Sequence, residues 1–380
     1  MKKSLLITLY FPPVRGGISN SLWNICSHLP YDKIAVLTEP AKNSLKTNFK
    51  VYRKKILKQS KFIWPEWIFL LYDIKKIIKK EHIQLLQAGQ ILPIGTVALI
   101  AKFFYGIPYI VYVYGQDLVI RRRSKIKMYL TGKILKYAQT VVTNSGYTKQ
   151  EALKLGSSKG KTIIVYPSPQ NNLDLNVDQH YFDYLVEHHN LTGKKVILSV
   201  GNIVQRKGYD KMIEALPSVI KKVPNVQYII VGNGPFREEL ESLIKQHDVG
   251  NYVKIFDKVT DDELPYYYKC CHVFCMPSRS LKNKYGETID VEGFGMVYLE
   301  ANLFGKPVIG GNSGGVPEAI KHNVSGLVID PTNVQELAQS LITFLTDDKL
   351  AAKMGLAGSE HAQKNFRWEH EVKKINEILK

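Results

Sequence analysis

Residues 291–320 read VEGFGMVYLEANLFGKPVIGGNSGGVPEAI, and this stretch shows the structural unit that recurs along the chain. It predicts a glycine-rich loop, an apolar helix that begins near Gly295, a strand over 306–310 and a second glycine-rich loop over 311–318. Continuous runs of Val and Ile between helices are typical of parallel strands that are covered on both faces. The stretch therefore predicts part of an α/β domain with a parallel sheet.

The same alternation extends in both directions from this stretch. Apolar runs predict strands over 4–10, 34–38, 83–87, 110–114, 140–144 and 162–166, and again over 195–200, 227–232, 253–256, 273–276, 306–310 and 326–329. Two such series predict an α/β protein with two doubly wound, Rossmann-like domains. Pro, Asn and Asp interrupt the pattern between 167 and 186. We therefore expect domains over 1–175 and 186–362, with one or two helices after residue 360.

The composition is that of a globular protein with about two domains. The chain has 380 residues, of which 45% are hydrophobic and 23% are charged, so disorder is excluded for most of it. Four cysteines are too few for a disulfide scaffold and favour a reducing compartment. Cys270, Cys271 and Cys275 with His272 do not have the spacing of a zinc site, so we expect no metal at these residues.

The net charge of +18 is confined to the first half of the chain. Residues 1–150 contain 25 Lys and Arg against 6 Asp and Glu, whereas residues 151–380 contain 27 against 28. A one-sided basic charge indicates an anionic partner, either nucleic acid or a membrane surface. No segment reaches the ~18 uninterrupted apolar residues that span a bilayer. The apolar run after Lys2 and Lys3 is interpreted as a buried strand rather than a signal peptide.

Loops beyond the carboxyl ends of the strands are the candidate binding site, because open α/β sheets bind ligands there. Gly16 and Gly17 precede a helix, where backbone amides can approach an anion, although an ordinary turn is the alternative. Arg206 and Lys207 lie in the loop 201–208 and suit a diphosphate, since Arg offers a fork of donors and Lys a point charge. A solvated surface pair is the alternative.

The loop before the apolar helix of 291–320 is a third candidate. Gly293 and Gly295 allow a ligand close to the backbone, and a helix that starts there favours phosphate. Glu292 lies at the mouth of this loop. Glu300 lies one to two turns into the apolar helix, where a carboxylate needs a partner such as a sugar hydroxyl. The alternative is a helix cap and a surface Glu.

Together these segments resemble the family 4 glycosyltransferases of the GT-B fold. The similarity covers nearly the whole chain and includes FPPVRGG at 11–17, VYGQDL at 113–118, NSGYTKQEAL at 144–153, GNIVQRKGYDKMIEAL at 201–216, VGNGP at 231–235 and the stretch 291–320. Glu292 and Glu300 correspond to the E-x7-E pair of the family. The stretch ETIDVEGFGMVYLEA at 287–301 is similar to bacterial mannosyltransferases that act on phosphatidylinositol lipids.

The resemblance implies two Rossmann-like domains that face each other across a cleft, with residues 363–380 packing back on the first domain. It also implies a nucleotide-sugar donor held mainly by the second domain, with GDP-mannose favoured over UDP-linked sugars. Arg206 and Lys207 would neutralise the diphosphate, and Glu300 would bind the ribose. The other donor contacts implied are Gly16, Gly17, Val259, Glu292, Gly293, Phe294, Gly295, Met296 and Val297.

The family retains the anomeric configuration, which implies front-face transfer with the leaving diphosphate helping to take the acceptor proton. This scheme requires no divalent metal, and the sequence has no Asp-x-Asp motif, so the resemblance implies no metal and no cofactor. Tyr114 stands where many relatives have a His, so its hydroxyl or Asp117 would have to replace a His contact to the sugar. The catalytic residues that the resemblance implies are Glu292, Arg206, Lys207, Tyr114 and Asp117.

The first domain meets the acceptor in this family, and its positive charge indicates an anionic acceptor or one in an anionic membrane. Aromatic residues beside four lysines in 61–82 suit an interfacial helix, with a core helix and a solvated lysine face as the alternative. We expect a lipid-linked or glycan acceptor and a cytoplasmic, peripheral location at the inner face of the cell membrane. The residues expected there are Trp64, Trp67, Arg121, Arg122 and Arg123, with a solvated helix start as the alternative for the three arginines.

Two other functions fit parts of the sequence. A sugar-nucleotide epimerase on the same fold would need acid and base residues near the sugar, and the E-x7-E block argues against it. A polyanion- or nucleic-acid-binding protein would use the basic half, but no aromatic RNA-binding motif or helix-turn-helix pattern is present. The leading hypothesis is a retaining glycosyltransferase for a cell-surface polysaccharide or glycolipid, with no nucleic-acid partner.

Overall fold

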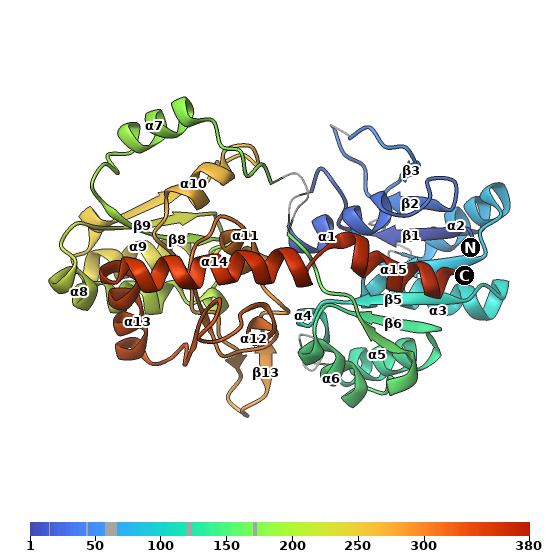
Figure 1. Ribbon diagram of the computed structural model, residues 1–380. Helices are drawn as coiled ribbons and strands as arrows, with labels where there is room; N and C mark the ends of the chain where they lie inside the picture. The colour runs from blue at the N-terminus through green and yellow to red at the C-terminus, as the bar shows by residue number, and fades with distance from the viewer. Residues whose placement is uncertain (15, 43–44, 58–66, 120–123, 170–172) are drawn as a thin grey trace. The chain divides into compact units, whose positions relative to one another are not determined.

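The structure is a computed structural model that describes residues 1–14, 16–42, 45–57, 67–119, 124–169 and 173–380. The chain forms two compact units (Figure 1). Unit 1 comprises Met1–Ser168 together with Trp368–Lys380, and unit 2 comprises Pro169–Arg367. Each unit is built around one large parallel sheet with helices on its faces, which confirms the predicted α/β class.

The sheet of unit 1 has the strand order β3-β2-β1-β4-β5-β6-β7, and its described strand pairs are all parallel. Strands β1, β2 and β5 are buried along their whole length, as expected for strands that are covered on both faces. The strands are β1 (Ser4–Thr8), β2 (Ile34–Thr38), β3 (Lys50–Arg53), β4 (Leu85–Ala88), β5 (Tyr109–Val113), β6 (Thr140–Thr143) and β7 (Thr162–Ile164).

Helices on the two faces of this sheet form two separate cores. Leu5 and Ile7 of β1 point into one core and Leu6 into the other. The first core is completed by α2, α3 and α5, and the second by α1 and α15. The helices of unit 1 are α1 (Gly17–Ser27), α2 (Ile68–Glu81), α3 (Thr96–Tyr105), α4 (Gln116–Val119), α5 (Lys125–Tyr137), α6 (Gly146–Lys154) and α15 (Trp368–Leu379).

Helix α15 belongs to unit 1 although the whole of unit 2 precedes it in the sequence. Trp368 is fully buried in the second core. The backbone N–H of Lys2 donates to the carbonyl of Leu379 at 2.5 Å, and the Glu371 carboxylate accepts from the backbone N–H of Tyr166 at 2.8 Å. These bonds join both ends of the chain to the same unit.

The sheet of unit 2 has the order β10-β9-β8-β11-β14-β15, again with parallel pairs throughout the described strands. Its strands are β8 (Lys195–Val200), β9 (Val226–Val231), β10 (Val253–Phe256), β11 (Val273–Met276), β14 (Val308–Gly311) and β15 (Gly326–Ile329). Its helices are α7 (Gln179–His188), α8 (Tyr209–Lys222), α9 (Arg237–Gln246), α10 (Leu264–Cys270), α11 (Met296–Leu303), α12 (Val316–Ala319), α13 (Val334–Thr346) and α14 (Asp348–Asn365).

Three strands were not predicted from the sequence. Strand β3 lies at the edge of its sheet and is partly exposed, so its KVYR sequence has no continuous apolar run. A short antiparallel hairpin of β12 (Leu281–Lys282) and β13 (Thr288–Asp290) lies outside the main sheet of unit 2. Its polar strands are too short for a periodic signal. Within the described residues, every helix is too short or too polar to traverse a lipid bilayer.

Candidate functional site

The loop between β8 and α8 presents Arg206 and Lys207 on a short 3-10 turn over Gln205–Lys207. Gly208 follows with a φ of 79°, and a Cβ at this position would lie 2.2 Å from the carbonyl oxygen of Pro277. Only glycine therefore fits at position 208, where the chain turns from the two cations into α8 and passes close to Pro277. The backbone N–H of Arg279 donates to the carbonyl of Arg206 at 2.7 Å and fixes the turn further.

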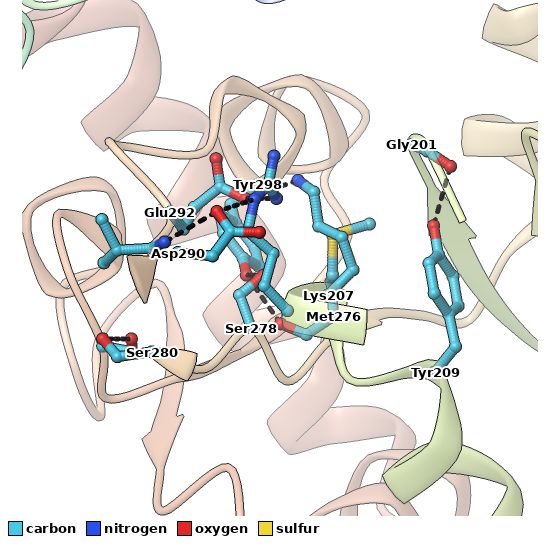
Figure 2. Close-up of polar contacts among 12 residues, drawn as sticks. Gly201, Lys207, Tyr209, Met276, Ser278, Ser280, Asp290, Glu292 and Tyr298 are labelled. Carbon is cyan, nitrogen blue, oxygen red and sulfur yellow. Dashed lines mark hydrogen bonds and ion pairs between the residues drawn. The ribbon is translucent and has the colours of Figure 1, made fainter. Parts of the chain in front are cut away.

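Two carboxylates contact these cations, so they are not a solvated surface pair (Figure 2). Lys207 Nζ lies 2.6 Å from Glu292 Oε2, and Arg206 Nη1 lies 3.2 Å from the same oxygen. Arg206 Nε lies 3.2 Å from Asp290 Oδ1. The side chains of Arg206, Lys207 and Glu292 are 14%, 10% and 13% exposed, so the four charges form a largely buried cluster.

The cluster is electrically balanced, because it contains two cations and two carboxylates. Burial opposes the charged form of Glu292, but the nearby Lys207 and Arg206 cations outweigh it and lower the pKa of this carboxyl. Burial lowers the pKa of Lys207, and the charge of Glu292 counteracts this effect. Glu292 is therefore ionised at neutral pH, and an entering anion would compete with it for the cations.

Two glycine-rich loops meet at Glu292. The backbone carbonyl of Glu292 accepts from the N–H of Gly315 at 3.0 Å. Gly314 has a φ of 57°, and a Cβ there would lie 2.1 Å from the same carbonyl oxygen. The glycine-rich loop over 311–318 thus supports the loop before α11 through close backbone packing, and no side chain would fit between them.

Helix α11 begins directly after this loop, with Gly295 in the left-handed conformation at its N-terminus. No side chain caps the first turn of this helix. Its first amides, those of Met296 and Val297, are part of the orphan donors that favour an anion. Gly293 is buried, and Phe294 is buried with its ring 5.6 Å from that of Phe366. The Phe294 side chain therefore packs in the fold, which leaves only its backbone for a ligand.

Glu300 lies further along α11 and is 5% exposed. Tyr268 of α10 donates its hydroxyl to Glu300 Oε2 at 2.6 Å. Burial raises the pKa of Glu300, although the hydrogen bond from Tyr268 opposes the rise. A buried carboxylate with one protein donor can accept further hydrogen bonds from ligand hydroxyls. Val259 lies in the loop between β10 and α10 and is half-buried.

The candidate residues of unit 1 lie in two separate regions, one around the start of α1 and one around the start of α4. Gly16 is exposed, with a φ of 138°, at the N-terminus of α1, and no side chain caps this helix either. Tyr114 is half-buried against the second core, and burial raises the pKa of its hydroxyl. Asp117 accepts a hydrogen bond from the backbone N–H of Tyr114 at 3.1 Å, so it holds the turn into α4. Gly17 is exposed in the first turn of α1.

The residues expected at the acceptor are only partly covered by the structure. Trp67 immediately precedes α2 and packs against the first core of unit 1. Trp64 and the three arginines, Arg121, Arg122 and Arg123, lie outside the described residues.

Two charged residues of the site were missed in the sequence. Asp290 contacts Arg206, and its spacing of two residues from Glu292 in an extended segment was an available signal. Arg279 forms a bidentate pair with Asp210 at 2.7 and 2.8 Å and so ties the end of β11 to the start of α8. Nothing in the local sequence indicates this second pair, because its partners are far apart along the chain.

Two family models match consecutive parts of the chain. The model described as Glycosyltransferase Family 4 matches residues 15–168, and the model described as Glycosyl transferases group 1 matches residues 184–361. The chain belongs to the family 4 glycosyltransferases. This confirms the predicted family and the predicted enzyme class.

Curated relatives match this glycosyltransferase over its full length. The GDP-mannose-dependent alpha-(1-6)-phosphatidylinositol monomannoside mannosyltransferase of Mycobacterium tuberculosis is 28% identical over 100% of this chain and 98% of its own. The GDP-mannose-dependent monoacylated alpha-(1-6)-phosphatidylinositol monomannoside mannosyltransferase of Corynebacterium glutamicum is also 28% identical, with the same coverage. The mannosyltransferase resemblance predicted from residues 287–301 is thus found across the whole chain.

Solved structures establish the fold of this glycosyltransferase. Anabaena HepE in complex with UDP and glucose is 22% identical, with a TM-score of 0.82 over 100% of this chain and 99% of its own. The sucrose-phosphate synthase of Thermosynechococcus elongatus is 20% identical, with a TM-score of 0.81 over 100% of this chain and 98% of its own. The two parallel sheets and these neighbours confirm the GT-B fold.

Proposed function

We propose that this glycosyltransferase transfers a mannosyl unit from GDP-mannose to a lipid-linked or glycan acceptor, with retention of the anomeric configuration. The observation that carries the proposal is the buried cluster of Arg206, Lys207, Asp290 and Glu292 beside the uncapped N-terminus of α11. Such a cluster can exchange an internal carboxylate for a diphosphate. Two cations and a row of free amides then stabilise the charge that develops on the leaving group.

The choice of donor base rests on the relatives. The curated mannosyltransferases that match over the full chain are named for GDP-mannose, whereas the HepE structure contains UDP and glucose. The sequence similarity favours GDP-mannose, because the structural similarity concerns the fold. UDP-linked sugars are the second choice.

We assign the ribose hydroxyls of the donor to Glu300. Its carboxylate is buried, its pKa is raised by burial, and Tyr268 occupies one oxygen at 2.6 Å. A vicinal diol would supply the missing hydrogen bonds and restore the charged form.

We propose that the acceptor approaches unit 1 at a membrane surface. Helix α3 contacts both α2 and α5, and all three pack on the same core. Their outer faces combine exposed aromatic and aliphatic side chains with lysines, a composition typical of interfacial helices. The exposed apolar residues are Ile68, Phe69, Tyr72, Phe103, Phe104, Ile126, Met128 and Tyr129.

The transfer itself is proposed to be front-face, with the leaving diphosphate taking the acceptor proton. In this scheme the protein contributes positioning and charge stabilisation, and no divalent ion takes part. Transfer should therefore persist in excess EDTA, and NMR of the first product formed should show the anomeric configuration of the donor. Loss of activity in EDTA with recovery on added Mg²⁺ would contradict the metal-free scheme.

Thermal shift with GDP, UDP, ADP, CMP and dTDP tests the donor. A nucleotide at 100 times its dissociation constant adds about 2.7 kcal/mol of stability, which is readily measured. Stabilisation by GDP alone supports mannosyl transfer from GDP-mannose, and stabilisation by UDP alone overturns the donor choice. No shift with any nucleotide, together with salt-sensitive binding to RNA, would favour the polyanion-binding function instead.

A pair of variants tests the ribose assignment. Glu300→Ala should weaken GDP binding about tenfold, equivalent to about 1.4 kcal/mol, because it removes charged acceptors for two hydroxyls. The wild type should also bind 2′-deoxy-GDP more weakly than GDP, whereas Glu300→Ala should no longer distinguish the two nucleotides. Tyr268→Phe, which keeps the carboxylate, is the matched control and should retain the discrimination. Equal discrimination in Glu300→Ala would remove the assignment.

A further inference from the structure

A cavity of about 360 Å³ lies in unit 2 between α7, the end of β10 and α10. We propose that it is a second carbohydrate site, which binds a short neutral saccharide beside the predicted donor contacts. The proposal rests on the proposed function, since a glycan-building enzyme provides the saccharide. Its volume is at the lower end of the ~300–1,000 Å³ range of small-molecule sites.

Helix α10 separates this cavity from the predicted ribose contact. Tyr267 lines the cavity, whereas the next residue, Tyr268, donates its hydroxyl to Glu300. Successive helical side chains point about 100° apart, so the two tyrosines face different sides. Of the predicted donor contacts, only Val259 also lines the cavity.

The cavity walls are unusually rich in aromatic rings. Tyr184 stacks on His188 at 5.4 Å between centroids and contacts Tyr181 at 5.9 Å. On the opposite wall, Phe256 lies 5.4 Å from Tyr267. Tyr181 and Tyr184 are 37% and 56% exposed, so packing within unit 2 leaves part of each side chain accessible to a ligand. Exposed rings at a concave site offer flat apolar surfaces to a ligand.

The polar groups of the cavity are suited to hydroxyls. Backbone and hydroxyl hydrogen bonds from Thr260 lower the pKa of Glu263, which leaves a charged acceptor at the rim. Burial lowers the pKa of His189, so its ring is neutral near pH 7, and Nε2 lies 3.2 Å from the Tyr267 hydroxyl. Asp257 and Lys258 also line the cavity with opposite charges. The lining thus combines hydrogen-bonding groups with little net charge.

A pyranose matches this combination better than a nucleotide does. One face of its ring carries C–H groups that lie flat on an aromatic ring, and its hydroxyls donate to carboxylates and imidazole. A phosphate would meet the Glu263 and Asp257 carboxylates with a single lysine to offset them. The cavity is therefore assigned to a neutral sugar, such as residues of the growing glycan.

Saturation-transfer NMR with an α-linked mannobiose tests the proposal on the full chain. Binding in the millimolar range is expected, with the strongest transfer to ring C–H protons. Tyr184→Ala should weaken this binding at least fivefold, and the fold should be unaffected because the side chain is exposed. Tyr31→Ala, a tyrosine of unit 1 that is 68% exposed and lies outside the proposed acceptor surface, is the matched control and should bind as the wild type does.

Adding GDP distinguishes this site from the donor site experimentally. Saturating GDP should leave the mannobiose signal in place, and Tyr184→Ala should keep the thermal shift with GDP. Absence of mannobiose binding, unchanged binding in Tyr184→Ala, or complete displacement by GDP would each overturn the second site. A missing thermal shift with GDP alongside intact, Tyr184-dependent mannobiose binding would overturn the proposed donor instead.

Discussion

Asp290 and Glu292 share Arg206, and we expect Asp290 both to position this side chain and to compete with the proposed donor diphosphate. Arg206 Nε lies 3.2 Å from Asp290, and Nη1 lies 3.2 Å from Glu292. A diphosphate must either displace one carboxylate from the guanidinium or bind beside it. Because the two carboxylates offset the two cations, the cluster attracts an anion less strongly than the cations alone would.

Asp290→Asn is expected to bind GDP more tightly than the wild type. Removing this carboxylate reduces repulsion of the diphosphate and leaves Arg206 with one charged partner. We expect a gain of about fivefold in affinity, equivalent to about 1 kcal/mol, by isothermal titration. Glu241→Gln, which neutralises an exposed carboxylate on α9, is the control and should change nothing. Weaker binding in Asp290→Asn would mean that Asp290 only holds Arg206 in place.

Glu81 is a second buried carboxylate, and we expect its ion pairs and hydrogen bonds to stabilise the fold. It is 2% exposed and contacts Lys3 at 3.1 Å, Lys50 at 2.9 Å and the Tyr52 hydroxyl at 2.5 Å. Burial opposes its ionisation, but hydrogen bonds from Tyr52 and the two lysines outweigh it and lower its pKa to about 2. The folded state therefore binds this proton less readily than the unfolded state does.

Glu81→Gln should lower the free energy of unfolding by about 3 kcal/mol at pH 7. The ordinary pKa of a glutamate is about 4.3, so this stabilisation is fully present above that pH. It should be lost as the pH falls from about 4.3 towards 2. Urea unfolding of wild type and variant should therefore differ at pH 7 and converge near pH 2. A constant difference over this range would contradict the ionic explanation.

At the scale of the elements, the sequence pattern predicted the strands that carry continuous apolar runs, including the edge strands β7, β10 and β15, and missed the strands without such runs. Continuous apolar runs identified β8, β10, β11 and β15 with the bounds that the structure has. Strand β3 and the β12–β13 hairpin are partly exposed, so no apolar run distinguishes them from loops. The same limit explains why Asp290, at the end of the hairpin, was missed as a site residue.

The candidate site divides in a similar way. Glycine loops and the pair of adjacent cations are local signals, so Gly295, Arg206 and Lys207 could be singled out from the sequence. The partners of these groups come from distant segments, and contacts such as Tyr268 with Glu300 depend on packing that local periodicity does not encode. The aromatic cavity beside α7 was missed because its lining is assembled from three separate elements.

Trp368→Ala tests the contribution of helix α15 to unit 1. The indole is fully buried in the second core, so its removal should destabilise unit 1 by about 3–5 kcal/mol. Urea unfolding followed by hydrogen exchange should show earlier exposure of the amides of β1 and β2, and unit 2 should be unaffected. Lys373→Ala, on the exposed face of the same helix, is the control. An unchanged midpoint for unit 1 would mean that α15 adds no stability.

At the scale of the whole molecule, the charge is divided unequally along the chain. The excess of Lys and Arg lies in residues 1–150, and the remaining 230 residues are nearly neutral. Exposed Phe103 and Phe104 lie on α3, between two lysine-bearing helices. The combination predicts an attachment that needs both an anionic surface and an apolar layer.

Sedimentation with lipid vesicles checks this prediction. We expect binding to vesicles that contain an acidic phospholipid, and binding should weaken as salt rises because the Debye length shrinks from about 10 Å at 0.1 M to about 3 Å at 1 M. Phe103→Ser with Phe104→Ser should reduce binding several-fold at low salt, whereas Phe182→Ser in unit 2 should not. Equal binding to neutral and acidic vesicles would contradict an electrostatic attachment.

The return of helix α15 to unit 1 has a consequence for biosynthesis. The ribosome synthesises residues 1–168 long before Trp368, because all of unit 2 is translated in between. At 5–20 residues per second, roughly 10–40 s separate the two events. During this interval the apolar surface formed by Leu22, Ile25 and Val36 lacks the helix that completes its core. The nascent amino-terminal unit is thus a natural client for a chaperone, and premature termination within unit 2 would leave that surface uncovered.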